Sequence, residues 1–236
     1  KVLTLVHPKQ STFEFFYMIH NLRSVNDSIY AHCLNVGLIA RMIGIWLKLP
    51  KNVIEHLTIA GLLHDIGKTR IPSDILNKTD ALTEEEFAVI HKHPKFGYDI
   101  LKNQNLDPHI LNAVLMHHER CDGSGYPNQL SGNEIDDYAI IIAIADVYDA
   151  MTAARIYRAP LCPFQVIAEF ENDGLQKYKP KYILTFLENI ATTYQNNRVI
   201  LSNGETAKIV FLNRQVYSKP LVQLDDGSCI DLNQSN

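Results

Sequence analysis

Histidine and aspartate side chains stand inside, or directly after, apolar segments of helical length, and this pattern constrains the fold more than any other feature of the sequence. His64 and Asp65 follow the apolar run 59–63, and Asp146 follows the run 140–145. Burying a polar group without a partner is costly. The sequence therefore predicts a helical core in which these side chains share a partner. A metal ion bound by imidazole nitrogen and carboxylate oxygen is such a partner.

The pattern recurs at three further histidines. His117 and His118 follow an apolar segment, and His32 begins a stripe of apolar residues, reaching Ile43, that has the spacing of one helix face. Each of these histidines alone is readily explained as a core residue with a hydrogen-bond partner, but their coincidence with the polar residues above favours a shared metal centre. The other histidines without such a context are interpreted as surface or structural residues: His7, His20, His56, His91 and His109.

Helical periodicity dominates from residue 28 to about residue 193. Within it, Thr83 and Glu86 have the spacing of a capping box. The expected helices are 29–49, 53–66, 83–93, 96–102, 108–117, 138–154, 163–171 and 181–194.

The composition changes near residue 196, where segments 207–212, 221–224 and 228–232 favour strands and 225–227 favours a turn. The sequence therefore predicts an all-α fold with a small C-terminal β appendage. The expected organisation is a flanking segment (1–27), a helical catalytic domain (28–195) and a β-strand tail that packs on it (196–236).

Composition excludes several classes of protein. The four cysteines form no CxxC pair, so neither a thiolate zinc site nor a disulfide framework is expected, and a reducing, cytoplasmic setting fits. No apolar run approaches the roughly 18 residues that cross a bilayer. A net charge of −4 argues against a nucleic-acid polymer as partner. Because the first residue is Lys, we expect a fragment whose upstream partner is a sensor domain or signalling protein.

The order of the motifs resembles the HD-GYP family of cyclic di-GMP phosphodiesterases, within the superfamily of HD metal-dependent phosphohydrolases. The resemblance covers nearly everything after about Asp27 and implies the helical bundle of that superfamily. The motifs are His64-Asp65-Ile66-Gly67-Lys68, His93-Pro94-Lys95-Phe96-Gly97, His117-His118-Glu119-Arg120, Asp122-Gly123-Ser124-Gly125-Tyr126-Pro127, Ile144-Ala145-Asp146-Val147-Tyr148-Asp149-Ala150-Met151-Thr152 and Arg155-Ile156-Tyr157-Arg158.

The resemblance implies two divalent ions, iron or manganese in the family, bridged by Asp65. The ligands of the first ion would be His32, His64, Asp65 and Asp146, and those of the second would be Asp65, His93, His117 and His118. Some members bind a third ion through a glutamate, but Ser28 stands at that position here, so two ions are expected. Cys121 and Tyr178 also depart from the family pattern without removing a ligand.

Other residues are expected to serve the substrate. Lys68 would steady a phosphate oxygen or protonate the leaving group; its alternative is a cation at a helix C-terminus. Arg155 and Arg158 would clamp phosphates, which requires the preceding helix to end or bend before Arg155. Tyr126 would offer its ring to a base or its phenol to phosphate, or belong to a plain turn.

Supporting roles are expected for three acidic residues. Asp149 would orient a ligand or a loop, and Glu119 and Asp122 would hold the loop that carries Tyr126.

The expected activity is hydrolysis of cyclic di-GMP by hydroxide activated at two metals. The product is linear pGpG, and further hydrolysis to GMP is left open. Cyclic GMP-AMP is an alternative substrate. Two other hypotheses are hydrolysis of nucleoside triphosphates or guanosine tetraphosphate, and a non-catalytic receptor for cyclic di-GMP.

Overall fold

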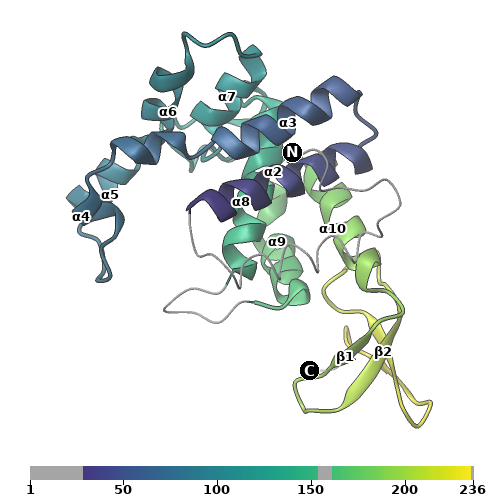
Figure 1. The fold of residues 1–236 in the computed structure, drawn as a ribbon. Coiled ribbons are helices and arrows are strands. Elements are labelled where there is room, and N and C mark those ends of the chain that lie inside the picture. The colour runs from purple at the N-terminus through teal and green to yellow at the C-terminus, as the bar shows by residue number, and fades with distance from the viewer. Residues whose placement is uncertain (1–28, 154–160, 235–236) are drawn as a thin grey trace. The chain divides into compact units, whose positions relative to one another are not determined.

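The computed structural model describes residues 29–153 and 161–234. The described chain divides into two compact units (Figure 1). The first takes its residues from Asp27–Ala150 and Leu175–Ile183, and the second from Met151–Gly174 and Leu184–Asn236.

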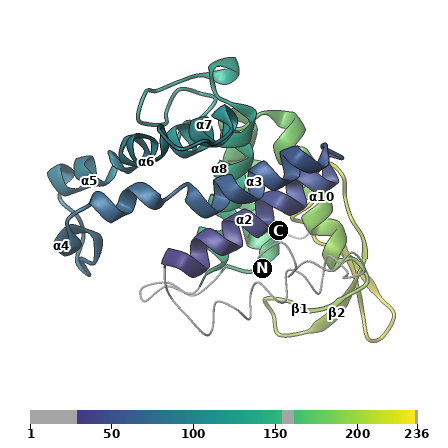
Figure 2. The same ribbon diagram turned by 45° about the horizontal axis from the view of Figure 1, so that its top comes forward.

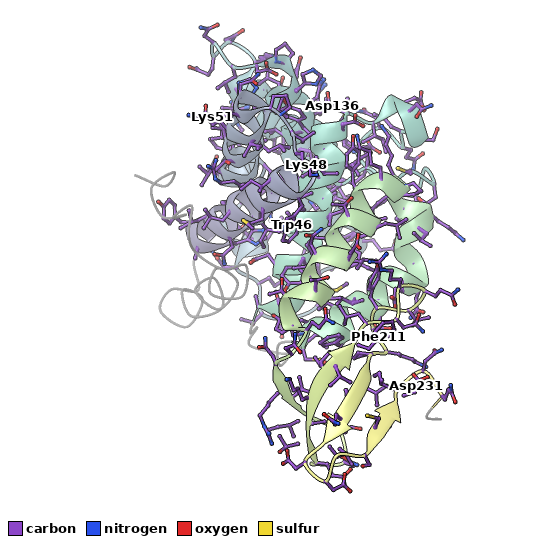
Figure 3. All side chains as sticks on the ribbon, turned by 90° about the vertical axis from the view of Figure 1, so that its right-hand side faces the viewer. Trp46, Lys48, Lys51, Asp136, Phe211 and Asp231 are labelled. Carbon is purple, nitrogen blue, oxygen red and sulfur yellow. The ribbon has the colours of Figure 1, made fainter. Side chains whose placement is uncertain are left out.

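Two long helices form the centre of the first unit. Helices α2 (Ile29–Trp46) and α3 (Lys51–Leu63) lie side by side (Figures 1 and 2), and Lys48 takes a left-handed conformation in the short connection between them (Figure 3). The helices approach closely because two glycines meet: a Cβ on Gly61 would lie 2.5 Å from the Cα of Gly37. This approach sets the spacing between His32 on α2 and the residues that follow α3.

The chain then makes a series of short helices. A 3-10 turn, η2 (Ile66–Arg70), directly follows Asp65. The elements after it are α4 (Ser73–Leu76), α5 (Glu84–Ile90), α6 (His93–Leu101), α7 (Pro108–Met116), the 3-10 turn η3 (Gly132–Glu134) and α8 (Asp137–Thr152). In Figure 2, α4 and α5 lie at one end of this unit.

The capping box is confirmed: the Thr83 side chain accepts from Glu86 N, and the Glu86 side chain accepts from Thr83 N. The break predicted at 94–95, between helices 83–93 and 96–102, is misplaced, because α5 ends at Ile90 and His93 begins α6. The reason is Pro94, whose missing N–H is tolerated in the first turn of a helix but not in its interior. His93 therefore stands at the start of a helix.

Helix α8 carries the apolar run that ends at Asp146. The run 140–145 is buried, as the sequence predicts. The helix ends at Thr152 and thus stops before Arg155, also as predicted.

The second unit combines helices with a small sheet. It includes most of α9 (Pro163–Lys177) and α10 (Pro180–Tyr194), and the rings of Phe170 and Phe186 pack edge to face at 5.7 Å. A four-stranded antiparallel sheet follows in the order β1 (Arg198–Ile200), β2 (Thr206–Phe211), β3 (Leu221–Leu224) and β4 (Cys229–Asp231). Figure 3 shows Phe211 at the end of β2.

The predicted fold class, helical with a small C-terminal β appendage, is confirmed. The sequence missed α4 and β1, and α9 extends beyond the predicted residue 171. Among the described helices, none has the length and apolar character needed to cross a membrane.

The close approach of α2 and α3 can be tested with Gly61→Ala. The added Cβ meets backbone atoms of Gly37, which cannot rotate away, so we expect a loss of about 1–3 kcal/mol in the free energy of unfolding by urea. The matched control is Gly44→Ala, whose Cβ would meet the side chains of Ile54 and Leu57 at 3.1 Å and backbone only at an ordinary contact distance of 3.8 Å. Equal losses for the two variants would contradict this account.

Candidate metal centre

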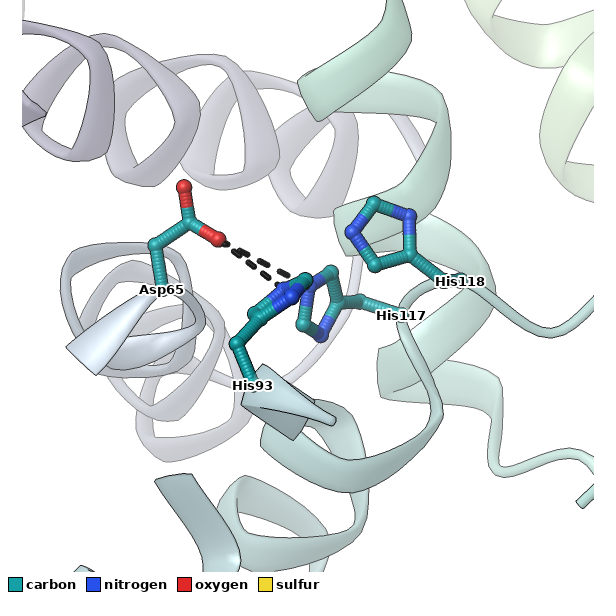
Figure 4. Close-up of side chains that lie close together, drawn as sticks. All are labelled: Asp65, His93, His117 and His118. Atoms are coloured by element: carbon teal, nitrogen blue, oxygen red, sulfur yellow. Dashed lines mark hydrogen bonds and ion pairs between the residues drawn. The ribbon is translucent and has the colours of Figure 1, made fainter. Parts of the chain in front are cut away.

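Four of the predicted ligands converge on one point of the first unit. Asp65, His93, His117 and His118 each offer a ligand atom, and these atoms lie within 4.8 Å of one another (Figure 4). Asp65 Oδ1 is 3.2 Å from His93 Nε2 and 3.9 Å from His117 Nε2. The three histidines come from the start of α6 and from the two residues that directly follow α7, so residues that are distant in sequence meet at one carboxylate.

A second group shares the same aspartate. His32, His64 and Asp65 again offer atoms within 4.8 Å of one another. Asp65 Oδ2 is 3.5 Å from His64 Nε2 and 3.7 Å from His32 Nε2. Asp146 Oδ1 joins this group, at 3.2 Å from His32 Nε2 and 4.0 Å from His64 Nε2. The two oxygens of Asp65 thus face two different groups, and all seven predicted ligands are brought together.

Hydrogen bonds fix which nitrogen of each ring is free. The Nδ1–H groups of three histidines donate to backbone carbonyls: His64 to Gly61 at 2.7 Å, His93 to Ile90 at 2.7 Å and His117 to Val114 at 2.9 Å. A carbonyl can only accept, so the proton of each neutral ring is on Nδ1 and the Nε2 lone pair faces the centre. This arrangement orients imidazoles as metal ligands.

His32 is held in the same way by a carboxylate. Its Nδ1 lies 2.8 Å from Asp149 Oδ2, which leaves Nε2 directed at Asp65 and Asp146. The expectation that Asp149 orients a ligand therefore agrees with its position. Asp149 is itself buried on α8, one turn after Asp146.

Two features of the cluster call for a cation. The Nε2 atoms of His93 and His117 are 3.2 Å apart, although both rings carry their protons on Nδ1, so two lone pairs face each other. Nε2 of His64 is buried and has no hydrogen-bond partner among the described residues. A bound cation removes both penalties. The clusters are consistent with a binuclear metal site, and their nitrogen and oxygen donors fit iron or manganese without selecting between them.

The surroundings of these side chains favour the protonation states in which histidine and aspartate bind metal. Burial lowers the pKa of His64, and burial together with the neighbouring imidazoles lowers the pKa of His117 far below its usual value. Burial lowers the pKa of His118 to about 3. Burial alone would raise the pKa of Asp65, but the nearby imidazoles and the Lys68 ammonium hold it well below its usual value. Neutral imidazoles beside an ionised carboxylate are what metal binding requires.

His32 differs from the other ligands. Burial lowers its pKa, but the carboxylates of Asp146 and Asp149 outweigh burial and raise the pKa to about 10. His32 is also more exposed than His64, at 23% against 1% of the side chain. It therefore lies at the outer side of its group.

A glycine places Asp65 beside His93. A Cβ on Gly67 would lie 1.9 Å from the carbonyl oxygen of His93 and 2.5 Å from the amide nitrogen of Gly97, so only glycine lets η2 touch α6 here. Lys68, the next residue, donates from Nζ to Asp65 Oδ2 at 2.5 Å. Its ammonium thus lies at the cluster.

The loop after His118 is held as predicted. Glu119 is buried and accepts from the amides of Asn128 at 2.7 Å and Leu130 at 2.9 Å. Asp122 accepts from the amide and the hydroxyl of Ser124.

The aromatic ring of Tyr126 is in contact with two imidazoles. Its centroid is 3.7 Å from that of His91 and 4.6 Å from that of His118, with interplanar angles of 15° and 22°. Sequence reasoning missed the His91 contact. The available signal was its position one helical turn after Phe87, whose ring it also touches at 4.2 Å. Arg155, Arg158 and Ser28 lie outside the described residues.

Comparison with known proteins agrees with this geometry. Residues 17–182 match the HD domain family. The chain belongs to the HD-domain family. A cyclic di-GMP phosphodiesterase of Thermotoga maritima is 35% identical over 179 residues, which cover 75% of this chain and 49% of the relative. A 3'3'-cGAMP-specific phosphodiesterase of Vibrio cholerae is 32% identical over 188 residues, covering 78% of this chain and 36% of the relative.

A solved structure shares the fold of this HD-domain chain. Bd1817, an HDG"Y"P protein from Bdellovibrio bacteriovorus, superposes with a TM-score of 0.59 at 19% identity, covering 75% of this chain and 60% of that one. The resemblance to the HD-GYP family is thereby confirmed. The chain spans about half the length of the Thermotoga relative and about a third of the Vibrio one.

The support that Asp149 gives to His32 predicts an effect on metal binding. Asp149→Ala removes the acceptor for His32 Nδ1, and we expect Mn²⁺ affinity, measured by calorimetric titration, to fall about 10- to 100-fold. Asp149→Asn keeps an acceptor oxygen and should lose less. Asp99→Ala, which removes a surface partner of Lys102, is the control and should bind as the wild type does. Wild-type affinity in Asp149→Ala would refute the role of this bond.

Proposed function

We propose that this chain is a metal-dependent phosphodiesterase that hydrolyses cyclic di-GMP to linear pGpG, with GMP as a further product. The observation that carries the proposal is the pair of histidine and aspartate groups that share Asp65. Support also comes from relatives named as cyclic di-GMP phosphodiesterases, at 30–42% identity. We further infer that the activity resides in residues 28–195 and that residues 196–236 are an appendage packed on that domain.

In this proposal two cations, iron or manganese, occupy the two groups. The first would be held by His32, His64, Asp65 and Asp146, and the second by Asp65, His93, His117 and His118. When bound, such a pair supplies Lewis acidity, which lowers the pKa of water and neutralises the charge of a phosphodiester. The protein would hold seven side chains, which offer nitrogen or oxygen atoms and no sulfur, close together in the first unit.

Lys68 is the side chain best placed to move a proton. Its ammonium reaches Asp65 Oδ2 from η2 and its side chain is a quarter exposed, so it can also face a substrate at the cluster. We infer that it steadies a non-bridging phosphate oxygen or protonates the departing ribose oxygen.

Tyr126 would contribute through its hydroxyl rather than its ring face. Two imidazoles stack on the ring, which leaves no face for a purine base. Arg155 and Arg158 remain proposed phosphate clamps on the strength of the family motif.

Cyclic GMP-AMP is the second candidate substrate. It is favoured by the Vibrio cholerae relatives named as 3'3'-cGAMP-specific phosphodiesterases, at 32% and 36% identity. A non-catalytic receptor is less favoured because none of the seven donors is replaced.

A product assay tests the proposal. Protein purified anaerobically and loaded with Fe²⁺ or Mn²⁺ is given cyclic di-GMP, cyclic GMP-AMP, GTP and guanosine tetraphosphate, and the products are separated by chromatography. We expect pGpG from cyclic di-GMP and no hydrolysis of GTP or guanosine tetraphosphate. Preferred cleavage of cyclic GMP-AMP would select the second candidate. Hydrolysis of GTP alone, or binding of cyclic di-GMP without turnover, would overturn the proposal.

If Lys68 acts on the substrate, its replacement should lower the rate of hydrolysis without changing the amount of bound metal. Lys68→Met keeps the aliphatic stem but removes the ammonium, so we expect kcat to fall about 10²- to 10³-fold while the metal content per chain stays that of the wild type. Lys102→Met, at a surface ion pair with Asp99, is the control and should keep its rate. An unchanged kcat in Lys68→Met would show that Lys68 acts only as a cation at the end of a helix and not in catalysis.

A further inference from the structure

The Tyr126 ring lies between two histidines of different kinds. One is the proposed ligand His118, and the other is His91, which belongs to neither metal group. At centroid distances of 3.7 Å and 4.6 Å, two nearly parallel imidazoles on the same face of one ring would overlap. They therefore cover opposite faces, and the order of the stack is His91, Tyr126, His118.

The outer end of the stack is anchored by α5. The capping box of Thr83 and Glu86 fixes where this helix begins, and His91 follows its last residue, Ile90. The His91 ring is also in contact with Phe87, one turn earlier, at 4.2 Å and 57°. The His91 ring thus contacts Phe87 of the preceding helix and stacks on Tyr126.

His118, at the inner end of the stack, differs from the other four histidines of the metal centre in how its ring is held. Nδ1 of each of His32, His64, His93 and His117 is hydrogen bonded to a carboxylate or a carbonyl. Within residues 29–153 and 161–234, no hydrogen bond to the ring of His118 is found, and its ring contacts are with His93, His117 and Tyr126. Of these three contacts, the one with Tyr126 is the nearest to parallel, at 22°.

We infer that His91, acting through Tyr126, is a positioning residue for the metal ligand His118. The inference rests on the metal centre of the proposed function, and it does not depend on which cyclic dinucleotide is cleaved. Tyr126 transmits the contact because its ring fills the space between the two imidazoles. His91 itself touches neither the metal groups nor, in this account, the substrate.

Metal affinity tests the inference without reference to turnover. In a calorimetric titration with Mn²⁺, we expect His91→Ala to weaken one of the two bound equivalents about three- to tenfold, the effect of losing one aromatic contact. His91→Phe keeps a flat ring against Tyr126 and should restore the affinity. The matched control is His109→Ala, which removes a histidine that packs on another tyrosine, Tyr138, at 4.9 Å and away from the centre. It should bind Mn²⁺ as the wild type does.

A double-mutant cycle separates positioning from general stability. If His91 acts through Tyr126, adding His91→Ala to Tyr126→Ala changes Mn²⁺ affinity no further, whereas independent effects would add. Thermal unfolding of the metal-free variants identifies any loss that comes from the fold alone. Wild-type affinity in His91→Ala, failure of His91→Phe to rescue, or additivity in the cycle would each overturn the inference.

The outcome of the Mn²⁺ titration can be distinguished from a failure of the proposed hydrolytic function. A metal-loaded wild type that cleaves no cyclic dinucleotide would refute that function, while the titration would still decide the role of His91. A wild type that bound neither Mn²⁺ nor Fe²⁺ would overturn both.

Discussion

The buried carboxylate of Asp65 lies between two groups of imidazole nitrogens, and the rest of the first unit is arranged around this contact. Oδ1 faces His93 and His117, and Oδ2 faces His64 and His32. At 2% exposure an aspartate without compensating charge would be strongly unfavourable. The same is true of imidazoles whose lone pairs point at one another. The Lys68 ammonium supplies one compensating charge, and the cluster as a whole is consistent with a binuclear metal site.

Backbone contacts supply the accuracy that such a site needs. Gly37 and Gly61 let α2 and α3 approach closely, and Gly67 lets the turn after Asp65 touch the start of α6. Carbonyl groups near the ends of α3, α5 and α7 then accept from Nδ1 of His64, His93 and His117 and fix the directions of these rings. Broken helices are thus useful here, because each break leaves a free carbonyl three residues before a histidine. In the described part of the chain His118 has no such bond, and its ring lies against Tyr126.

Much of this could be predicted from sequence because the relevant signals are local. An apolar run that ends in His64 and Asp65, or in Asp146, shows directly that polar groups are buried, and the capping box at Thr83 is a pattern of four residues. The break between α5 and α6 was predicted at residues 94–95 but lies at residues 91–92, because Pro94 is accommodated in the first turn of α6. The strand Arg198–Ile200 was missed because three residues give no measurable alternation. The role of His91 could not be predicted, since its contact with Tyr126 joins segments that only the tertiary fold brings together.

The most direct test of the central role of Asp65 is the number of metal ions per chain. Elemental analysis of protein loaded anaerobically with Fe²⁺ or Mn²⁺ should give two ions per wild-type chain. Asp65→Ala, which removes the one donor shared by both groups, should lose bound metal and turnover together. A wild-type chain that holds no more than one ion, or an Asp65→Ala variant that keeps its full turnover, would contradict a centre bridged by this carboxylate.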